Sequence, residues 1–329
     1  MTKGRIFSGM QPSGRFHLGN YLGALENWVK LQRDYECFFS IVDWHALTSS
    51  YEDTSKIPER IHDMALDWLS AGLDPEKSVI FVQSHVKEHA ELHLLLSMMT
   101  PLSWLERVPT YKDKLQQLGE QGKDINTYGF LGYPELMTAD IILYKADTVP
   151  VGEDQLPHLE LSREIIRRFN YLYQPIFPEP AGMLSKSSVL PGIDGRKMSK
   201  SYGNEIPFAG SAEEITARVR LMVTDPQRVK RTDKGNPDVC NVYTFHKLFN
   251  QEQCSEISIA CRAAEIGCVD CKKRLAAQMV EQLAPMHEKR LELSAKPAMV
   301  AEILHAGAER ARKVAQDTMA EVRSAMHLG

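Results

Sequence analysis

The chain has 329 residues, of which 43% are hydrophobic and 25% are charged, and its formal net charge is −4. These values are ordinary for a soluble globular protein with one large or two medium domains, and they give no overall attraction to nucleic acid. Residues 1–7 contain no signal-peptide core, and no uncharged run approaches the roughly 20 residues that a membrane helix requires. We therefore expect a cytoplasmic protein without a membrane segment, whose six cysteines are thiols or metal ligands rather than disulfides.

The first predicted element is a short apolar run at Ile6 and Phe7, which leads into a glycine-rich turn at residues 9–20. Beyond it, apolar residues recur at the spacing of one helix face, which predicts a strand, a turn and a helix. These residues are Leu18, Leu22, Leu25 and Val29. Glycines permit a close backbone approach, and unpaired N–H groups at a helix start suit a phosphate. The turn therefore indicates a nucleotide site, with an ordinary strand-to-helix connection as the alternative.

Two further apolar runs of strand length lie at residues 36–45 and 78–83, with a helical pattern at residues 61–69 between them. Strands that alternate with helices over short connections predict an α/β fold with a doubly wound parallel sheet. The first run ends in Asp43 and His45. Because ligands bind beyond the carboxyl ends of parallel strands, we expect both side chains to face the site. No Gly-x-Gly-x-x-Gly pattern is present, which disfavours a dehydrogenase-type dinucleotide site.

A predicted apolar helix at residues 136–144 contains a single carboxylate, Asp140. Burying a charge is costly unless a donor binds it, so Asp140 needs a donor or must face solvent. A short strand at residues 149–152 then runs into two carboxylates and an amide at residues 153–155. These groups either cap the next helix or bind ribose hydroxyls or an α-amino group.

A second glycine-rich loop, at residues 191–196, is followed by Lys-Met-Ser-Lys-Ser at residues 197–201. This sequence and His-Leu-Gly-Asn at residues 17–20 resemble the two signatures of class I aminoacyl-tRNA synthetases, Lys-Met-Ser-Lys-Ser and His-Ile-Gly-His. The later signature is an unaltered match. The earlier one has Leu18 for Ile and Asn20 for the last His, which keeps a hydrogen-bond donor and loses a titrating imidazole.

Three longer segments narrow the resemblance to bacterial tryptophanyl-tRNA synthetases. They are residues 6–14, 136–140 and 149–155, within a likeness that covers about residues 5–205 and is looser beyond. The resemblance implies a Rossmann-like catalytic domain at residues 1–205 and a helical anticodon-binding domain at residues 206–329. It also implies a homodimer that uses ATP and Mg²⁺ to form tryptophanyl-adenylate from L-tryptophan and then esterifies tRNA(Trp).

The same resemblance assigns individual side chains to the substrates. Those implied at ATP are Gln11, Ser13, Gly19, Asn20, Asp154, Lys197, Met198, Ser199 and Lys200. Those implied around tryptophan are Phe7, His45, Met137, Asp140, Val149, Val151 and Gln155. His17, Lys197 and Lys200 are implied to act on the phosphates, and Lys112 matches a family lysine that reaches toward them. The segment between Lys112 and Tyr133 is longer and more polar than in the family's common form, which weakens the match at Lys112.

The chemistry of the amino acid supports these assignments. An indole ring has a large apolar body and one N–H donor, so a selective pocket needs aromatic or Met packing and one buried acceptor. Phe7, Met137 and Asp140 supply these parts. Phenylalanine would leave the carboxylate unpaired, whereas tyrosine can donate its hydroxyl and must be rejected by size. Adenylate formation needs no protein nucleophile, only positioning and stabilisation of charge on phosphate oxygens.

After residue 205 the pattern becomes helical, with breaks at residues 225–226 and 235–237, and the last helix is free to pack back on the first domain. Because the net charge is negative, any contact with RNA must be local. The candidate basic patches are Arg218 with Arg220, then Arg228, Lys230, Arg231 and Lys234, and finally Lys272, Lys273 and Arg274. Each is either a solvated surface or part of an RNA-binding face.

This helical part also holds five of the six cysteines: Cys240, Cys254, Cys261, Cys268 and Cys271. Four thiolates are the ligand set that iron–sulfur clusters and Zn²⁺ prefer, and packed free thiols are the alternative. The spacing of Cys261, Cys268 and Cys271 is similar to that in a subset of tryptophanyl-tRNA synthetases with a [4Fe–4S] cluster. We expect Cys240 as the fourth ligand, with Cys254 as its rival and zinc as the alternative metal.

Three other functions compete with that of a tryptophan–tRNA ligase. A tyrosine-specific relative would use the same chemistry, but residues 136–140 and 152–155 argue against it. A nucleotidyltransferase that charges no RNA would have no use for the basic helical part. A non-catalytic RNA-binding paralogue would not need to keep residues 17–20 and 197–201 intact.

Overall fold

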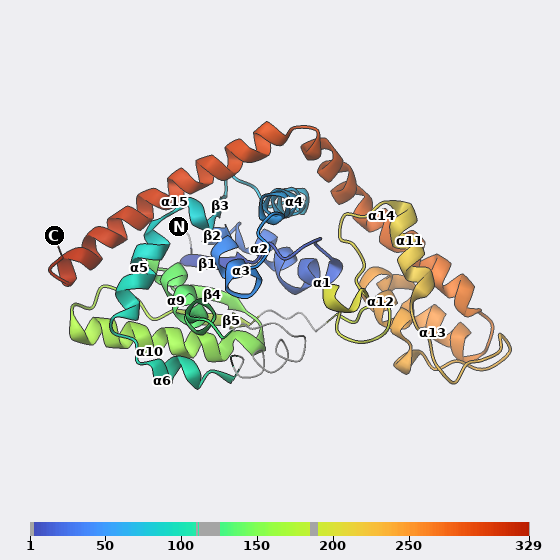
Figure 1. Ribbon diagram of the computed structural model, residues 1–329. Helices are drawn as coiled ribbons and strands as arrows, with labels where there is room; N and C mark the ends of the chain where they lie inside the picture. Colours follow the sequence, from blue (N-terminus) through green and yellow to red (C-terminus); the bar gives the residue numbers. More distant parts are fainter. Residues whose placement is uncertain (1–2, 110, 112–125, 185–189, 329) are drawn as a thin grey trace.

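The computed structural model describes residues 3–109, 111, 126–184 and 190–328. The described residues form a five-stranded parallel sheet in the order β3-β2-β1-β4-β5, with helices on both of its faces (Figure 1). The strands are β1 (Arg5–Met10), β2 (Glu36–Ile41), β3 (Ser78–Val82), β4 (Thr148–Val151) and β5 (Ala181–Leu184). The predicted Rossmann-like, doubly wound α/β fold is therefore confirmed.

Helices make up most of the remaining described chain. Those of the first half are α1 (Leu18–Asn20), α2 (Glu26–Leu31), α3 (Asp43–Ser50), α4 (Ile57–Ser70), α5 (Glu88–Ser97), α6 (Leu102–Glu106), α8 (Tyr128–Leu131), α9 (Tyr133–Leu143) and α10 (Leu156–Leu172). Those that follow are α11 (Ala212–Leu221), α12 (Asn241–Phe249), α13 (Cys254–Arg262), α14 (Cys268–Ser294) and α15 (Pro297–Ala325). One π-helical segment lies at Tyr21–Leu25, and 3-10 segments lie at Gln83–His85, Glu153–Gln155, Lys200–Tyr202, Pro237–Val239 and Gln251–Gln253. None of the described helices has both the length and the apolar character needed to cross a membrane.

The two faces of the sheet support separate hydrophobic clusters, because successive side chains of a strand point in opposite directions. Ile6 and Phe39 pack with α2 and α4 on one face. Phe7 and Phe38, the neighbours of these residues in the chain, pack with α5, α9 and α10 on the other. Strand β3 is buried along its whole length, as expected for a parallel strand covered on both sides.

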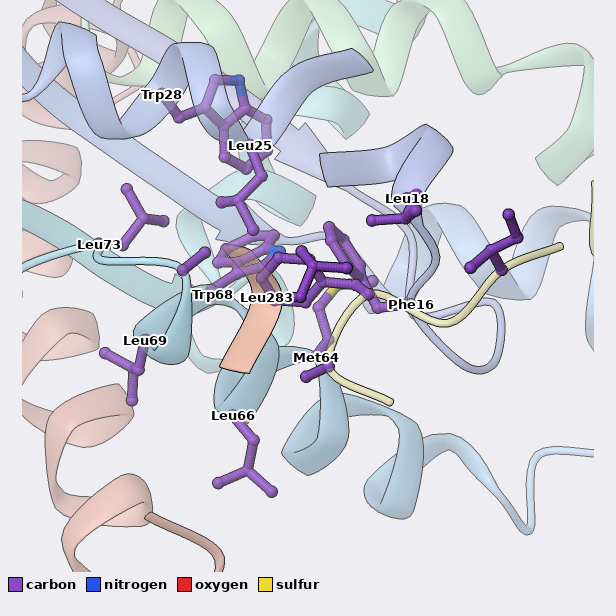
Figure 2. Close-up of a cluster of buried hydrophobic side chains, with 14 of the residues drawn as sticks. Phe16, Leu18, Leu25, Trp28, Met64, Leu66, Trp68, Leu69, Leu73 and Leu283 are labelled. Carbon is purple, nitrogen blue, oxygen red and sulfur yellow. The ribbon is translucent and has the colours of Figure 1, made fainter. Parts of the chain in front are cut away.

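Two tryptophans hold α2 and α4 against the first face (Figure 2). The Trp28 ring stacks on Phe39 with centroids 4.8 Å apart and meets Trp68 edge-on at 5.1 Å. Leu283 of α14 belongs to the same cluster, so apolar packing extends from the sheet into the helical part. This contact helps to fix the helical part relative to the sheet.

An ion-pair network adds to the contact between α14 and α4. Arg290 donates hydrogen bonds of 2.8 Å to Asp67 and to Asp63. Burial raises the pKa of Asp67 to about 6, although the positive charge of Arg290 acts in the opposite direction. Helix α14 is thus anchored to the sheet domain by both charged and apolar contacts.

Helix α15 crosses the molecule and covers the sheet edge at β3 (Figure 1). A Cβ atom at Gly307 would lie 1.8 Å from the carbonyl oxygen of Ile80, so this approach requires glycine. Ala308, Ala311 and Ala315 continue the close contact as buried small side chains. The last helix therefore packs back on the sheet edge, whereas α14 packs with α11 and α12 and meets the sheet domain at α4.

Candidate active site

A cavity of about 740 Å³ lies between β1 and β4. The strand order reverses here, because β2 and β3 lie on one side of β1, and β4 and β5 lie on the other. Open α/β sheets bind ligands at such a switch point. Many residues predicted for the two substrates share this lining: Phe7, Gln11, Ser13, Asn20, His45, Met137, Asp140, Val149, Val151, Gln155, Lys197 and Ser199. Segments far apart in the chain therefore meet around one space.

Other predicted residues lie beside the cavity rather than in its lining. They are His17, Gly19, Asp154, Met198 and Lys200. Asp154 accepts a hydrogen bond of 3.0 Å from the Gln155 amide. Lys112 lies outside the described residues. The expectation for Asp43 is wrong, because its carboxylate accepts the backbone N–H of Ser84 at 3.0 Å and does not line the cavity.

The two signature segments contact each other. The Lys200 ammonium donates to the Ser13 hydroxyl at 3.4 Å. A Cβ atom at Gly19 would lie 3.0 Å from Nδ1 of His17, which is tight, and 3.5 Å from Cβ of Met198, which is ordinary contact. The glycine therefore leaves room for the His17 ring, and Met198 of the second signature packs beside it.

Electrostatic effects concentrate at this contact. Burial and the nearby charge of Lys200 lower the pKa of His17 to about 4. Burial and the charge of Arg60 lower the pKa of Lys200 to about 8. Because positively charged groups lie close together here, protonation of a further group is unfavourable. The same positive potential would attract an anionic ligand. Arg60 was not singled out from the sequence, because it lies on α4, far from either signature in the chain.

Asn20, which replaces the second histidine of the first signature, accepts the backbone N–H of His17 at 3.2 Å. It therefore serves as a capping residue at the start of α1. Asn20, Gly23, Ala24 and Asn27 all line the cavity along one helical face. The spacing of Asn27 from Asn20 is a helical signal that sequence reasoning did not use.

The loop that carries the second signature is organised by a buried amide. Asn204 donates to Asp194 at 2.7 Å and to the Lys197 carbonyl at 3.1 Å, and it accepts the Ser199 N–H at 2.8 Å. A Cβ atom at Gly192 would lie 2.3 Å from this amide, so the close approach requires glycine. Sequence reasoning missed Asn204, since only the folded loop brings its partners together.

Asp140 is 1% exposed, and its carboxylate is surrounded by hydrogen-bond donors. Gln83 Nε2 lies 2.7 and 2.9 Å from its two oxygens, His45 Nε2 lies 2.9 Å from Oδ2, and His89 Nδ1 lies 2.7 Å from Oδ1. Burial acts to raise the pKa of Asp140, but the imidazoles of His89 and His45 outweigh it and hold this pKa below its usual value. The inference that a buried Asp140 needs donors is confirmed, and Gln83 and His89 are donors that the sequence did not reveal.

Tyr133 is a further lining residue that the sequence did not identify as part of the site. Its ring meets that of His45 edge-on, with centroids 4.5 Å apart. Burial and the charge of Asp140 raise the pKa of Tyr133 to about 12, while a hydrogen bond with the Gln11 side chain acts in the opposite direction. The hydroxyl is therefore protonated at neutral pH and is hydrogen-bonded to the Gln11 side chain, which also lines the cavity.

In the helical part, four cysteines influence one another. Burial raises the pKa of Cys271 to about 12, and Cys240, Cys261 and Cys268 add to this effect. Burial also raises the pKa of Cys254, and Lys247 acts in the opposite direction; none of the other described cysteines is among the causes. In the described part of the chain, no three His, Cys, Asp or Glu side chains are arranged to hold a metal ion.

Arg228, included among the candidate RNA contacts, is instead a buried structural residue. It is 8% exposed, and its guanidinium donates to the carbonyl of Ile266 at 2.8 Å. It also lies 3.6 Å from the sulfur of Cys261. The basic patch at residues 228–234 is therefore smaller than the sequence indicated.

Comparisons with known proteins agree with this geometry. The family of class I tRNA synthetases for W and Y matches residues 2–284. A tryptophan–tRNA ligase of Thermotoga maritima is 53% identical over 327 residues, which cover 98% of this chain and 99% of that protein. The chain belongs to the tryptophan–tRNA ligases. A second ligase of this family, from Aquifex aeolicus, is 44% identical and is matched over 98% of this chain and 100% of its own length.

Solved structures of this ligase family share the whole fold. The tryptophanyl-tRNA synthetase of Campylobacter jejuni, solved with ADP and tryptophan, is 36% identical with a TM-score of 0.90, over 98% of this chain and 100% of that one. A tyrosyl-tRNA synthetase of Archaeoglobus fulgidus has a TM-score of 0.66, but at 19% identity it shows only the fold.

Proposed function

We propose that this protein activates L-tryptophan with ATP to form tryptophanyl-adenylate and then transfers the tryptophanyl group to tRNA(Trp). The observation that carries the proposal is the combination of groups that line one cavity. Asp140 offers a buried, ionised acceptor, and Lys197 belongs to the signature that suits phosphates. A single-substrate binding protein would have no need for both groups in the same space.

In this proposal, Asp140 accepts the indole N–H and thereby selects tryptophan over phenylalanine. Phe7 and Met137 pack against the ring, and Val149 and Val151 complete the apolar wall. The polar side chains of His45 and Gln155 also line the cavity and are assigned to the amino acid.

The nucleotide is assigned to the signature segments. The residues proposed to bind ATP are Gln11, Ser13, Gly19, Asn20, Asp154, Lys197, Met198, Ser199 and Lys200. The carboxylate of tryptophan attacks the α-phosphate, and pyrophosphate leaves. Lys197, Lys200 and His17 stabilise the charge that develops on the phosphate oxygens. Lys112 keeps the same assignment, although it lies outside the described residues.

Mg²⁺ would neutralise phosphate charge during this step. Magnesium in such sites is held mainly by phosphate oxygens and water, with few protein ligands.

We further propose residues 1–205 as the catalytic domain and residues 206–329 as the helical domain that reads the anticodon. Exposed cations of the helical domain support an RNA-binding role, in particular Lys273, whose side chain is 69% exposed. The proposal includes a homodimer in the cytoplasm.

A [4Fe–4S] cluster is proposed for the four cysteines Cys240, Cys261, Cys268 and Cys271, with zinc as the alternative metal. The support is chemical: Cys240, Cys261 and Cys268 each act to raise the pKa of Cys271, so the four thiols share one region of the helical part. Cys254 is not in this set, which favours Cys240 as the fourth ligand. Four thiolates would supply the donor set that such a cluster needs.

Amino-acid-dependent ATP–pyrophosphate exchange, measured with tryptophan and tyrosine side by side, tests the central proposal. Protein purified without oxygen should exchange with tryptophan and fail with tyrosine. Exchange with tyrosine would show that the protein is a tyrosine-specific relative. Folded protein that exchanges with neither would favour the non-catalytic RNA-binding alternative.

A further inference from the structure

Behind Asp140, a chain of polar groups continues into the core. Nδ1 of His89 lies 2.7 Å from Asp140, and Nε2 of His89 lies 2.7 Å from the hydroxyl of Tyr144. His89 and Tyr144 are both 0% exposed. Neither lines the cavity, whereas Asp140 and His45 do. The two residues therefore act on the proposed amino-acid site through residues that line it, and not by contact with a ligand.

Two short contacts hold the His89 ring between Asp140 and Tyr144. Burial raises the pKa of Tyr144 well above its usual value, so its hydroxyl stays protonated. Among the described residues, His89 is the only hydrogen-bond partner of that hydroxyl. Nδ1 of the same ring faces Asp140 at 2.7 Å. Tyr144 therefore supports His89 from the side away from the cavity.

Stacked aromatic rings hold Tyr144 in place. Its ring lies parallel to Phe7, with centroids 5.6 Å apart and planes inclined by 6°, and it stacks on Phe38 at 4.6 Å. Phe7 itself lines the cavity. One buried ring thus supports both the apolar wall and the acceptor, which couples their positions.

A carboxylate that takes up a new donor must keep its own orientation. Gln83 Nε2 contacts both oxygens of Asp140, so one of these contacts can yield to a ligand N–H while the other remains. His89 contacts only Oδ1 and is held from behind, so it fixes the plane of the carboxylate during this exchange. Supporting hydrogen bonds of this kind preserve the geometry of a recognition group.

We propose that His89 and Tyr144 are positioning residues that orient Asp140 and so determine selectivity for an amino acid with a ring N–H donor. This inference rests on the proposed role of Asp140 as the acceptor of that donor. It adds two residues that touch no substrate and that determine how well the acceptor works.

The test compares tryptophan with its benzothiophene analogue, in which sulfur replaces the ring N–H. Pyrophosphate exchange gives KM for each amino acid and for ATP in wild type, His89→Leu, His89→Asn and Tyr144→Phe. Tyr243→Phe is the matched control, because it removes a hydroxyl that donates to a backbone carbonyl at 3.2 Å in the helical part. Thermal unfolding of each variant reports whether it is folded.

We expect wild type to prefer tryptophan over the analogue by about 10- to 100-fold, the range for a hydrogen bond to a buried charge. His89→Leu should raise KM for tryptophan about tenfold, with little change for the analogue or for ATP. His89→Asn should keep most of the preference, because its amide N–H can replace Nδ1–H. Tyr144→Phe should reduce the preference about threefold, and the control should match wild type.

Two results would overturn the inference in distinguishable ways. Wild type that treats both amino acids alike would remove the proposed role of Asp140 and the inference with it. A second result would overturn the inference alone. In it, wild type prefers tryptophan over the analogue, but His89→Leu keeps the same preference or uses both amino acids equally poorly. If His89→Leu does not fold, Tyr144→Phe decides, since it removes a single oxygen atom and keeps the stacked ring.

Discussion

The cavity at the sheet and the thiols of the helical part bury polar groups in opposite ways. At the cavity, three side chains donate to Asp140, and all of them come from the fold itself. In the helical part, the four sulfurs have few such partners within the described residues: Arg228 near Cys261 and His246 near Cys271. The first arrangement is complete without a ligand, whereas the second has no comparable set of partners among the described residues. The carboxylate is thus held by the fold itself, but the proposed cluster would depend on what binds there.

The largest expected effect concerns the cluster proposed at the thiols. Cys261→Ser should reduce iron in anaerobically purified protein from about four atoms per chain to near zero, with loss of the brown chromophore, because a cluster needs four thiolates. Cys254→Ser is the matched control and should retain the iron. Tryptophan-dependent exchange should change less than about twofold in either variant, since the cavity is built separately. Wild type without iron but with one bound zinc would select the alternative metal. Loss of metal in Cys254→Ser as well as in Cys261→Ser would exchange the roles of Cys240 and Cys254, and retention of metal in Cys261→Ser would contradict the proposed ligand set.

The second prediction concerns catalysis at the cavity and leaves the thiols unchanged. Lys200→Ala should lower kcat for pyrophosphate exchange by about 10²- to 10³-fold, because a charge that acts on the phosphates is lost from a partly buried site. KM for tryptophan should stay within about twofold, and the metal content should not change. Lys30→Ala removes a lysine whose exposed ammonium pairs with Glu26 at 2.9 Å, and it should behave as wild type. Equal losses of kcat and tryptophan binding would contradict a role confined to the phosphates.

The smallest expected effect is a change of the free energy of unfolding with pH, which we expect from a residue beside the cavity and not from the thiols. His17 has a folded-state pKa of about 4, below its usual value of 6.5, because of burial and the charge of Lys200. Its neutral form therefore stabilises the folded state fully above pH 6.5, and this stabilisation is lost as pH falls from 6.5 toward 4. Between pH 7 and pH 5 the loss amounts to about 2 kcal/mol of the free energy of unfolding. The thiol of Cys271, with a pKa raised to about 12, does not titrate in this window.

Urea unfolding of wild type and His17→Gln at pH 7 and pH 5 measures this difference. The variant should lose about 2 kcal/mol less than wild type over the same interval. Parallel losses in both proteins would show that His17 is not the group responsible.

The sequence predicted the parts of the fold that depend on buried periodic patterns. Strands β1, β2, β3 and β4 are apolar runs next to turn or polar segments, so their number and direction followed from the pattern. Strand β5 was not predicted, because Ala181–Leu184 is short and mostly exposed and has no such pattern. The place of α15 was left open, since the small residues around Gly307 have meaning only against the backbone of β3.

The candidate site was predictable where a residue lies next to a strand end or within a signature. His45 and Gln155 are of this kind, and both line the cavity. His89 and Tyr144 were missed because their roles arise from contacts between elements far apart in the chain. Asn204 was missed for another reason: its partners are near in the chain, but only the folded loop turns their polar groups toward its amide. Asp43 was misassigned for a related reason: it follows a strand closely, but a backbone N–H after β3 is its partner.

The covering of β3 by α15 also has a consequence for the order in which the molecule is assembled. On the ribosome, β3 is synthesised long before α15, so its outer edge of N–H and carbonyl groups stays open while the intervening chain is made. An open edge of this kind is a site for pairing with other nascent chains. The sheet edge is therefore closed only after most of the chain has emerged, and the contact of Gly307 with Ile80 marks where that late closure is tightest.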